Sequence, residues 1–88
     1  MTKTFNMEIL QKSLENMGFK TIEWEEGWEI EDTFKARMTT NRGDITVTAS
    51  RGEIVQIVKP NGTRKYYYEC TNAQIAQYVR QTMSYYVK

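Results

Sequence analysis

The fold of this chain is decided by GDITVTASRGEIVQIVKPNGTRKYYYEC, residues 43–70. Apolar and polar side chains alternate through most of this stretch, and β-branched residues are frequent, which is typical of half-buried β-strands. The glycine-bearing turns SRG and PNG divide it into strands near 44–50, 53–59 and 63–70. The stretch therefore predicts three consecutive antiparallel strands joined by short hairpin loops.

Two more strands are expected upstream, near 19–24 and 28–39, because the turns EEG and NRGD separate further alternating segments. A helix is expected before them, over residues 6–17, with Asn6 as its N-cap and Gly18 as its left-handed C-terminal residue.

A second helix is expected over residues 72–87, after the capping box formed by Thr71 and Gln74. The order α-β-β-β-β-β-α predicts one α+β domain over residues 1–88. Its simplest form is a five-stranded antiparallel meander with both helices on one face of the sheet.

Strand registers follow from keeping apolar side chains on one face, since a slip of one residue exchanges the faces. We expect loops at 25–27, 41–44 and 50–52 and a last turn centred on Asn61-Gly62, where Pro60 makes a four-residue loop of the same parity equally possible. The resulting pairs are Trp24 with Trp28, Met38 with Val47, Val47 with Val55, and Val55 with Tyr68. This register turns Tyr66 and Tyr68 toward the core and leaves Tyr67 exposed. Cys70 shares their parity and is expected to be buried.

Composition excludes several chemistries. The chain has no histidine and one cysteine, so it has no His-containing catalytic triad, no His-ligated metal and no thiolate zinc cluster. It also has no glycine-rich phosphate loop. We expect a non-enzymatic protein with no cofactor and no metal.

Charge is distributed unevenly along the chain. Residues 1–35 carry four lysines and eight acidic residues, whereas residues 36–88 carry eight basic and three acidic residues. Six of the acids lie in EWEEGWEIED, residues 23–32. Acids that alternate along a strand do not converge on one ion, so this hairpin is either a solvated edge or a contact surface for a partner.

The first functional interpretation is therefore a domain that binds another protein, such as a phage-type inhibitor of a host protein. The contact surface would combine the acidic hairpin with the polar sheet face, and its expected residues are Glu23, Glu29, Glu31, Arg37, Lys65 and Tyr67. The open sheet face could also pair with a second copy of the chain. The alternative is a weak nucleic-acid-binding module, because TRKYYYEC places basic residues beside aromatic ones.

No apolar run reaches the length of a membrane span or a signal peptide, so a cytoplasmic protein without membrane contact is expected. Three segments, MEILQKSLENMGFKTIEW, GDITVTASRGEIVQIVKPNGTRKYYYE and IAQYVRQTMSYYV, resemble an uncharacterised small-protein family. That family is encoded in algal plastid and cyanobacterial genomes, with relatives in other bacteria. The resemblance implies an α+β fold of unknown function, and it assigns no site residues.

Overall fold

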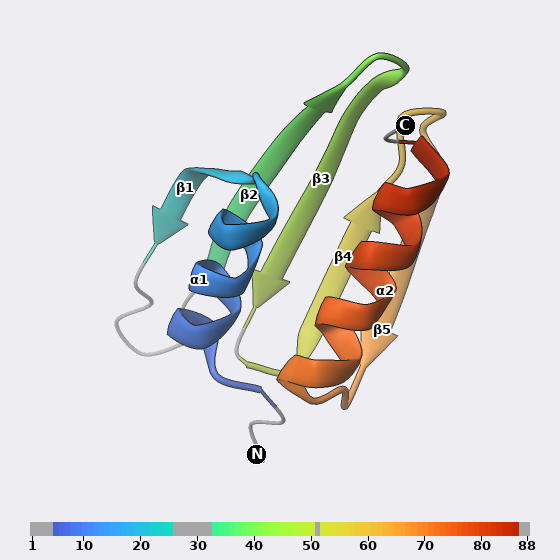
Figure 1. The fold of residues 1–88 in the computed structure, drawn as a ribbon. Helices are drawn as coiled ribbons and strands as arrows, with labels where there is room; N and C mark the ends of the chain where they lie inside the picture. Colours follow the sequence, from blue (N-terminus) through green and yellow to red (C-terminus); the bar gives the residue numbers. More distant parts are fainter. Residues whose placement is uncertain (1–4, 26–32, 51, 87–88) are drawn as a thin grey trace.

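The computed structural model describes residues 5–25, 33–50 and 52–86, with the backbone alone for 23–25. Figure 1 shows the order of the elements. They are α1 (Met7–Met17), β1 (Lys20–Glu25), β2 (Thr33–Thr40), β3 (Gly43–Ser50), β4 (Ile54–Val58), β5 (Arg64–Tyr68) and α2 (Asn72–Tyr86). The predicted helices and strands are therefore present among the described residues, and residues 28–32 of the strand predicted over 28–39 lie outside them.

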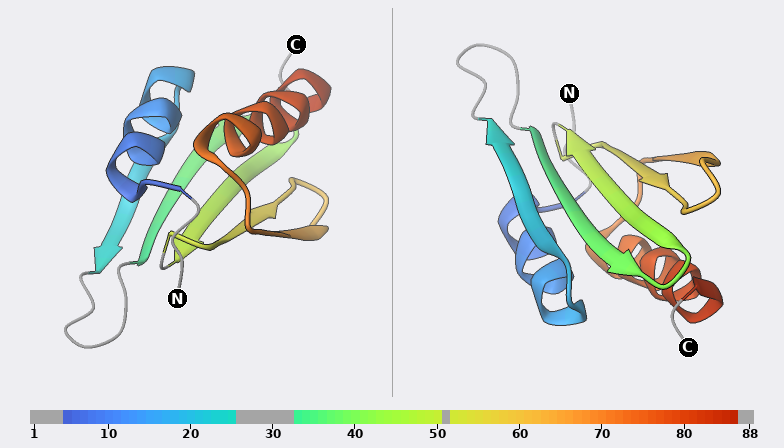
Figure 2. Two further views of the ribbon diagram at one scale, coloured as in Figure 1. Left: turned by 90° about the horizontal axis from the view of Figure 1, so that it is seen from below. Right: turned by 90° about the horizontal axis from the view of Figure 1, so that it is seen from above.

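The five strands form one antiparallel sheet in the order β1-β2-β3-β4-β5. Both helices lie against the same face of this sheet, α1 toward the β1 side and α2 toward the β5 side (Figure 2). The predicted α+β architecture is confirmed. The opposite face of the sheet, which we call the helix-free face, has no helix over it within the part of the chain that the structure describes.

The predicted end residues of α1 are confirmed in detail. The Asn6 side chain accepts a hydrogen bond from the backbone N–H of Ile9 at 3.0 Å, which satisfies one of the free donors of the first turn. Gly18 has φ of 106°, and the N–H of Phe19 donates to the carbonyl of Leu14 at 2.9 Å. A side chain at Gly18 would be strained by this positive φ, which explains why the helix ends at a glycine.

The start of α2 is fixed by two sets of hydrogen bonds. Thr71 and Gln74 bond reciprocally, backbone to side chain, at 2.9 and 3.2 Å, as the capping box predicts. Asn72 then joins this end to the start of α1. Its side chain accepts from the N–H of Asn6 at 2.8 Å and donates to the carbonyl of Asn6 at 3.0 Å.

The core lies between the helices and the sheet. Phe34, Leu10, Leu14, Ile45 and Val79 are completely buried in it. Phe5 and Phe19, which flank α1, are also buried against the same cluster. This one cluster connects both helices with the central strands, so the described residues pack around a single core.

Two of the predicted registers are wrong by two residues. Met38 pairs with Ile45 instead of Val47, and Val47 pairs with Ile57 instead of Val55. A shift of two residues keeps every side chain on its predicted face, so Val47 and Val55 are buried as expected. The β2–β3 turn is tighter than the expected four-residue loop because Thr40 pairs directly with Gly43. The hydroxyl of Thr40 also donates to the Gly43 carbonyl at 2.7 Å.

The predicted β1–β2 hairpin is also wrong in register. Trp24 pairs with Phe34 rather than with Trp28, and the register shifts between Thr21 and Glu23. Trp28 lies outside the described residues. Most of the expected turn at 25–27 also lies outside the described residues.

The last hairpin is wrong by one residue, and this difference exchanges the faces of β5. The backbone N–H of Lys59 donates to the carbonyl of Thr63 at 2.8 Å, so residues 60–62 form a three-residue loop. The Asn61 side chain accepts from the N–H of Thr63 at 2.9 Å, and Gly62 supplies a positive φ of 89°. Val55 consequently pairs with Tyr67. Tyr67 therefore lies on the helix side, whereas Tyr66 and Tyr68 are exposed, contrary to the sequence prediction.

Candidate nucleic-acid interface

Two exposed tyrosines mark the β5 side of the helix-free face. Tyr66 and Tyr68 are 51% and 62% exposed, and they are opposite Gln56 and Ile54 of the neighbouring strand. The Gln56 amide donates to the hydroxyl of Tyr66 at 3.2 Å, which limits the orientations of that ring. Residues two apart on a strand share a face and are about 7 Å from each other. The two rings therefore form a pair of neighbouring aromatic surfaces.

Basic residues continue this surface across the sheet. Arg64 lies on the same face of β5 as the two tyrosines, and it pairs with Val58, which pairs with Thr46. Thr46 pairs with Arg37, and Arg37 pairs with Lys20 on β1. The next row runs from Tyr66 through Gln56 and Thr48 to Lys35. Four basic side chains, Lys20, Lys35, Arg37 and Arg64, thus share the face of the two tyrosines.

The middle of this face is polar. Thr46, Thr48, Ser50 and Gln56 occupy it, and each is half-buried between its neighbours. Short hydroxyl and amide side chains leave the backbone surface accessible and offer both donors and acceptors. From β5 to β2 the face extends over three strand spacings, or about 14 Å.

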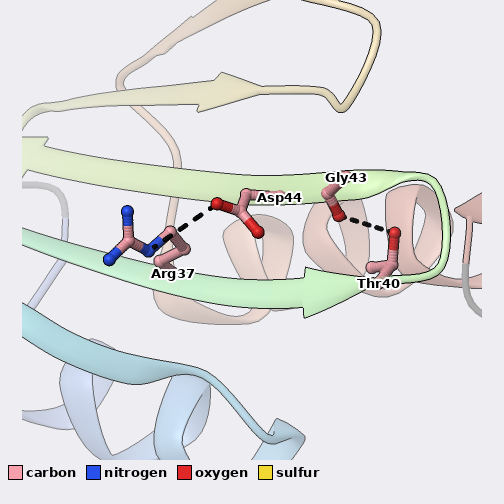
Figure 3. Close-up of polar contacts among 4 residues, drawn as sticks. All are labelled: Arg37, Thr40, Gly43 and Asp44. Atoms are coloured by element: carbon pink, nitrogen blue, oxygen red, sulfur yellow. Dashed lines mark hydrogen bonds and ion pairs between the residues drawn. The ribbon is translucent and has the colours of Figure 1, made fainter.

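One acidic side chain opposes these charges among the described side chains of the face. Asp44 lies 3.9 Å from the Nε of Arg37, with the two side chains 44% and 49% exposed (Figure 3). An exposed ion pair at this distance stabilises the fold by less than about 1 kcal/mol, so an anionic ligand can compete for Arg37. The backbones of Glu23 and Glu25 pair with Lys35 and Thr33, so these two acidic residues occupy register positions of the same face at its β1 edge.

The residues predicted as a partner surface do not form one surface. Arg37 lies on the helix-free face as expected. Lys65 and Tyr67 lie on the helix side of β5, opposite Ile57 and Val55, because of the three-residue loop. Glu23 is described by its backbone alone. Glu29 and Glu31 lie outside the described residues.

Tyr67 has a structural role instead. Its ring stacks on that of Tyr78 from α2, with centroids 4.4 Å apart and planes 13° apart. Burial raises the pKa of Tyr67, and the neighbouring Tyr78 and Cys70 raise this pKa further. The hydroxyl of Tyr67 thus remains protonated while its ring connects β5 to α2.

Cys70 packs against the core beside this contact but is only half-buried. Glu69 has φ of 56° and interrupts the strand alternation after Tyr68. The thiol of Cys70 lies 3.5 Å from the carbonyl of Tyr68. The prediction of a buried thiol is therefore right about its side of the sheet and wrong about the degree of burial.

Sequence reasoning missed Tyr66, Tyr68, Lys20 and Lys35 as members of one surface. The signal that identifies the tyrosines is the segment KPNGT, residues 59–63. The Asn61 side chain can accept a hydrogen bond from the N–H of Thr63 two residues later, which favours an Asx turn. Gly62 then allows the positive φ that closes a three-residue loop. An odd loop length then reverses the faces of the following strand.

Within the described ranges, no group of three or more metal-ligating side chains is found. No helix in the same part of the chain is long and apolar enough to cross a membrane.

The chain was also compared with known proteins. The resemblance to the plastid and cyanobacterial family stays a prediction. The chain matches no family model, no curated protein and no solved structure, so the interface described above rests on its own geometry.

Proposed function

We propose that this protein is a non-enzymatic domain that binds single-stranded nucleic acid on the helix-free face of its sheet. The observation that carries this proposal is the exposure of Tyr66 and Tyr68 on the same face as four basic side chains. The sequence alone favoured protein binding, because it predicted only one exposed tyrosine on this face. The observed register of β5 exposes two tyrosines there, which favours nucleic-acid binding instead.

The chemistry of the face suits an unpaired strand. Bases of a single strand stack on exposed aromatic rings, and each stacked base contributes about 1–3 kcal/mol to binding. The spacing of about 7 Å between Tyr66 and Tyr68 allows two successive bases of an extended strand to stack. The backbone of that strand can then run toward Arg64, Arg37 and Lys35, whose charges attract phosphates.

The expected binding mode is tolerant of sequence. Every base has a flat aromatic face, so stacking discriminates little between bases. A double helix hides these faces. We therefore expect a short single strand to bind more tightly than the same sequence as a duplex.

The proposal is tested by fluorescence anisotropy with a labelled single-stranded oligonucleotide that lacks terminal phosphates. The combined Tyr66→Ala and Tyr68→Ala variant should bind at least about 30-fold more weakly, from the lower limit of about 1 kcal/mol per ring. Ile9→Ala is the control, because Ile9 is an apolar side chain that is 54% exposed on α1, on the helix side of the sheet, and outside both proposed sites. Its affinity should equal that of the parent.

The salt dependence gives an independent measurement. Three or four phosphate contacts to a single strand predict that affinity falls about 20- to 50-fold between 50 and 200 mM salt. Lys35→Gln combined with Arg37→Gln should reduce this dependence, whereas Lys12→Gln on α1 should not. An oligonucleotide that fails to bind at low salt, or that binds the double tyrosine variant with parental affinity, would refute the proposal.

A protein partner is the second candidate, and a specific observation favours it. Ile54 and Val58 are half-exposed beside Tyr68 and Arg64 on the same face. Tyrosine and arginine around apolar residues are enriched in protein interfaces, including those between copies of one chain. A partner held in this way would bind with little salt dependence. Capture from a native host, compared between the parent and Tyr68→Ala, tests this candidate, and light scattering tests a homodimer.

A further inference from the structure

A second candidate site lies on the other side of the sheet, between the β4–β5 hairpin and the C-terminal half of α2. A pocket of about 460 Å³ is present there, within the size range of small-molecule sites. Its lining includes Lys59, Asn61, Lys65 and Tyr85. These side chains do not belong to the helix-free face, so this pocket is separate from the proposed strand-binding surface.

Two lysines give the pocket a positive charge. Lys65 pairs with Ile57 on the helix side of the sheet, and Lys59 lies two residues after Ile57 on the same side. The two lysines are therefore diagonal neighbours across the hairpin, where like charges repel. Among the described residues, no aspartate or glutamate lines the pocket and neither lysine has an ion pair. An anion between them would remove this repulsion.

Aromatic rings form the rest of the wall. Tyr67 and Tyr78 close the pocket with their stacked rings, and Tyr86 meets Tyr85 edge-on with centroids 4.9 Å apart. Tyr85 leaves most of its surface open to solvent. An open ring beside a positive charge is suited to a flat ligand that carries an anionic group. The hydroxyls and the Asn61 amide add hydrogen-bond donors.

One feature opposes an anion at this place. The pocket lies near the last turn of α2, and a helix C-terminus carries about half a negative charge. Two lysines supply a larger and opposite charge. The lysines lie on the hairpin side of the pocket, so an anionic group bound between them is directed away from the helix end. A flat ligand with such a group would place its ring on the α2 side of the pocket, beside Tyr85.

We propose that this pocket binds a nucleoside monophosphate. The phosphate lies between Lys59 and Lys65, and the base lies against the ring of Tyr85. The ligand is either a free mononucleotide or the phosphorylated end of a strand, since both present the same group. The proposal does not depend on strand binding by the helix-free face.

The test is a titration of the full chain with adenosine monophosphate, followed by amide chemical shifts in NMR. Saturable shifts are expected at Lys59, Asn61 and Lys65. Adenosine alone and inorganic phosphate alone should each bind at least about tenfold more weakly, because each lacks half of the contacts. Lys59→Gln with Lys65→Gln should weaken binding about 100-fold, and Tyr85→Ala about tenfold.

Two controls keep this test separate from the first proposal. Lys12→Gln changes an exposed lysine outside the pocket, and the Tyr66→Ala, Tyr68→Ala variant changes only the helix-free face. Both should bind adenosine monophosphate like the parent. Absence of saturable shifts, parental affinity in the double lysine variant, or equal affinity for phosphate and the nucleotide would each overturn the proposal.

The source of the ligand is then decided with oligonucleotides. A strand with a 5′ phosphate that binds more tightly than the same strand with a 5′ hydroxyl, and loses this advantage in the double lysine variant, assigns the pocket to strand ends. Equal affinity of the two strands, with adenosine monophosphate still bound, assigns it to free mononucleotides.

Discussion

Alanine substitution of three consecutive tyrosines provides the strongest test of the structure. Tyr66, Tyr67 and Tyr68 are chemically identical neighbours, and the register gives the middle ring a different role from the outer two. Tyr67 is half-buried and stacked on Tyr78, whereas Tyr66 and Tyr68 are more than half exposed. We expect Tyr67→Ala to destabilise the fold and the outer substitutions to weaken binding.

The size of each effect follows from burial. Removal of a fully buried aromatic ring costs about 3–5 kcal/mol, and loss of a stacked pair accounts for about 0.5–1.5 kcal/mol. Because Tyr67 is half-buried, we take the lower limit, about 3 kcal/mol. Tyr66→Ala and Tyr68→Ala lose mainly strand propensity, about 1 kcal/mol or less each.

Thermal unfolding measures the difference directly. In a domain of this size, 1 kcal/mol lowers Tm by about 4–8 °C, so Tyr67→Ala should lower it by about 12–24 °C. Each outer substitution should lower Tm by less than about 8 °C. The register predicted from strand parity requires the opposite pattern. If Tyr66→Ala or Tyr68→Ala lowers Tm more than Tyr67→Ala does, the β4–β5 register and both binding proposals based on it are refuted.

The remaining predictions concern stability. Phe34→Ala should cost about 3–5 kcal/mol in chemical denaturation, since its ring is completely buried, whereas the adjacent Thr33→Ala should cost under about 1 kcal/mol; similar midpoints for the two variants would contradict the assigned faces of β2. Gly18→Ala should cost about 1–2 kcal/mol because of its φ of 106°, and a stability equal to the parent would show that the helix ends differently. The raised pKa of Tyr67 means that the folded state holds this proton more tightly than the unfolded state, so the free energy of unfolding should fall as pH rises above about 10. Tyr67→Phe should reduce this fall, and an unchanged alkaline slope in that variant would count against it.

Much of the fold could be predicted because the local signals agree with one another. Asn6, Gly18 and Thr71 specify the ends of the helices through their own hydrogen bonds or backbone angles, which depend on few distant residues. Alternation along β2, β3 and β4 also identifies the buried faces correctly. The exact pairs could not be predicted in this way, because a shift of two residues preserves every face.

The candidate site was less predictable, since it depends on one loop. The length of the loop after β4 does not change which amino acids form β5, but it decides which side of the strand faces the helices. A loop of three residues turns the opposite side toward the helices from a loop of two or four residues. The hydrogen bond from Thr63 to the Asn61 side chain favours the three-residue form. Parity alone favoured the other form because it buries two tyrosines rather than one. Arg37 was assigned correctly because β2 carries its alternation independently of that loop.

The hydrogen bonds between Asn6 and Asn72 connect residues that are 66 positions apart in the chain. The Asn6 side chain caps α1, and the Asn6 backbone is held by the side chain of Asn72, the first residue of α2, so opening of either first turn should break the contact between them. Local opening of the first turns of α1 and α2 should therefore be a single cooperative event. Native-state hydrogen exchange would then report one common opening free energy for the first turns of α1 and α2. A protease that cuts the opened first turn of one helix would therefore act on a molecule in which the first turn of the other helix has also opened.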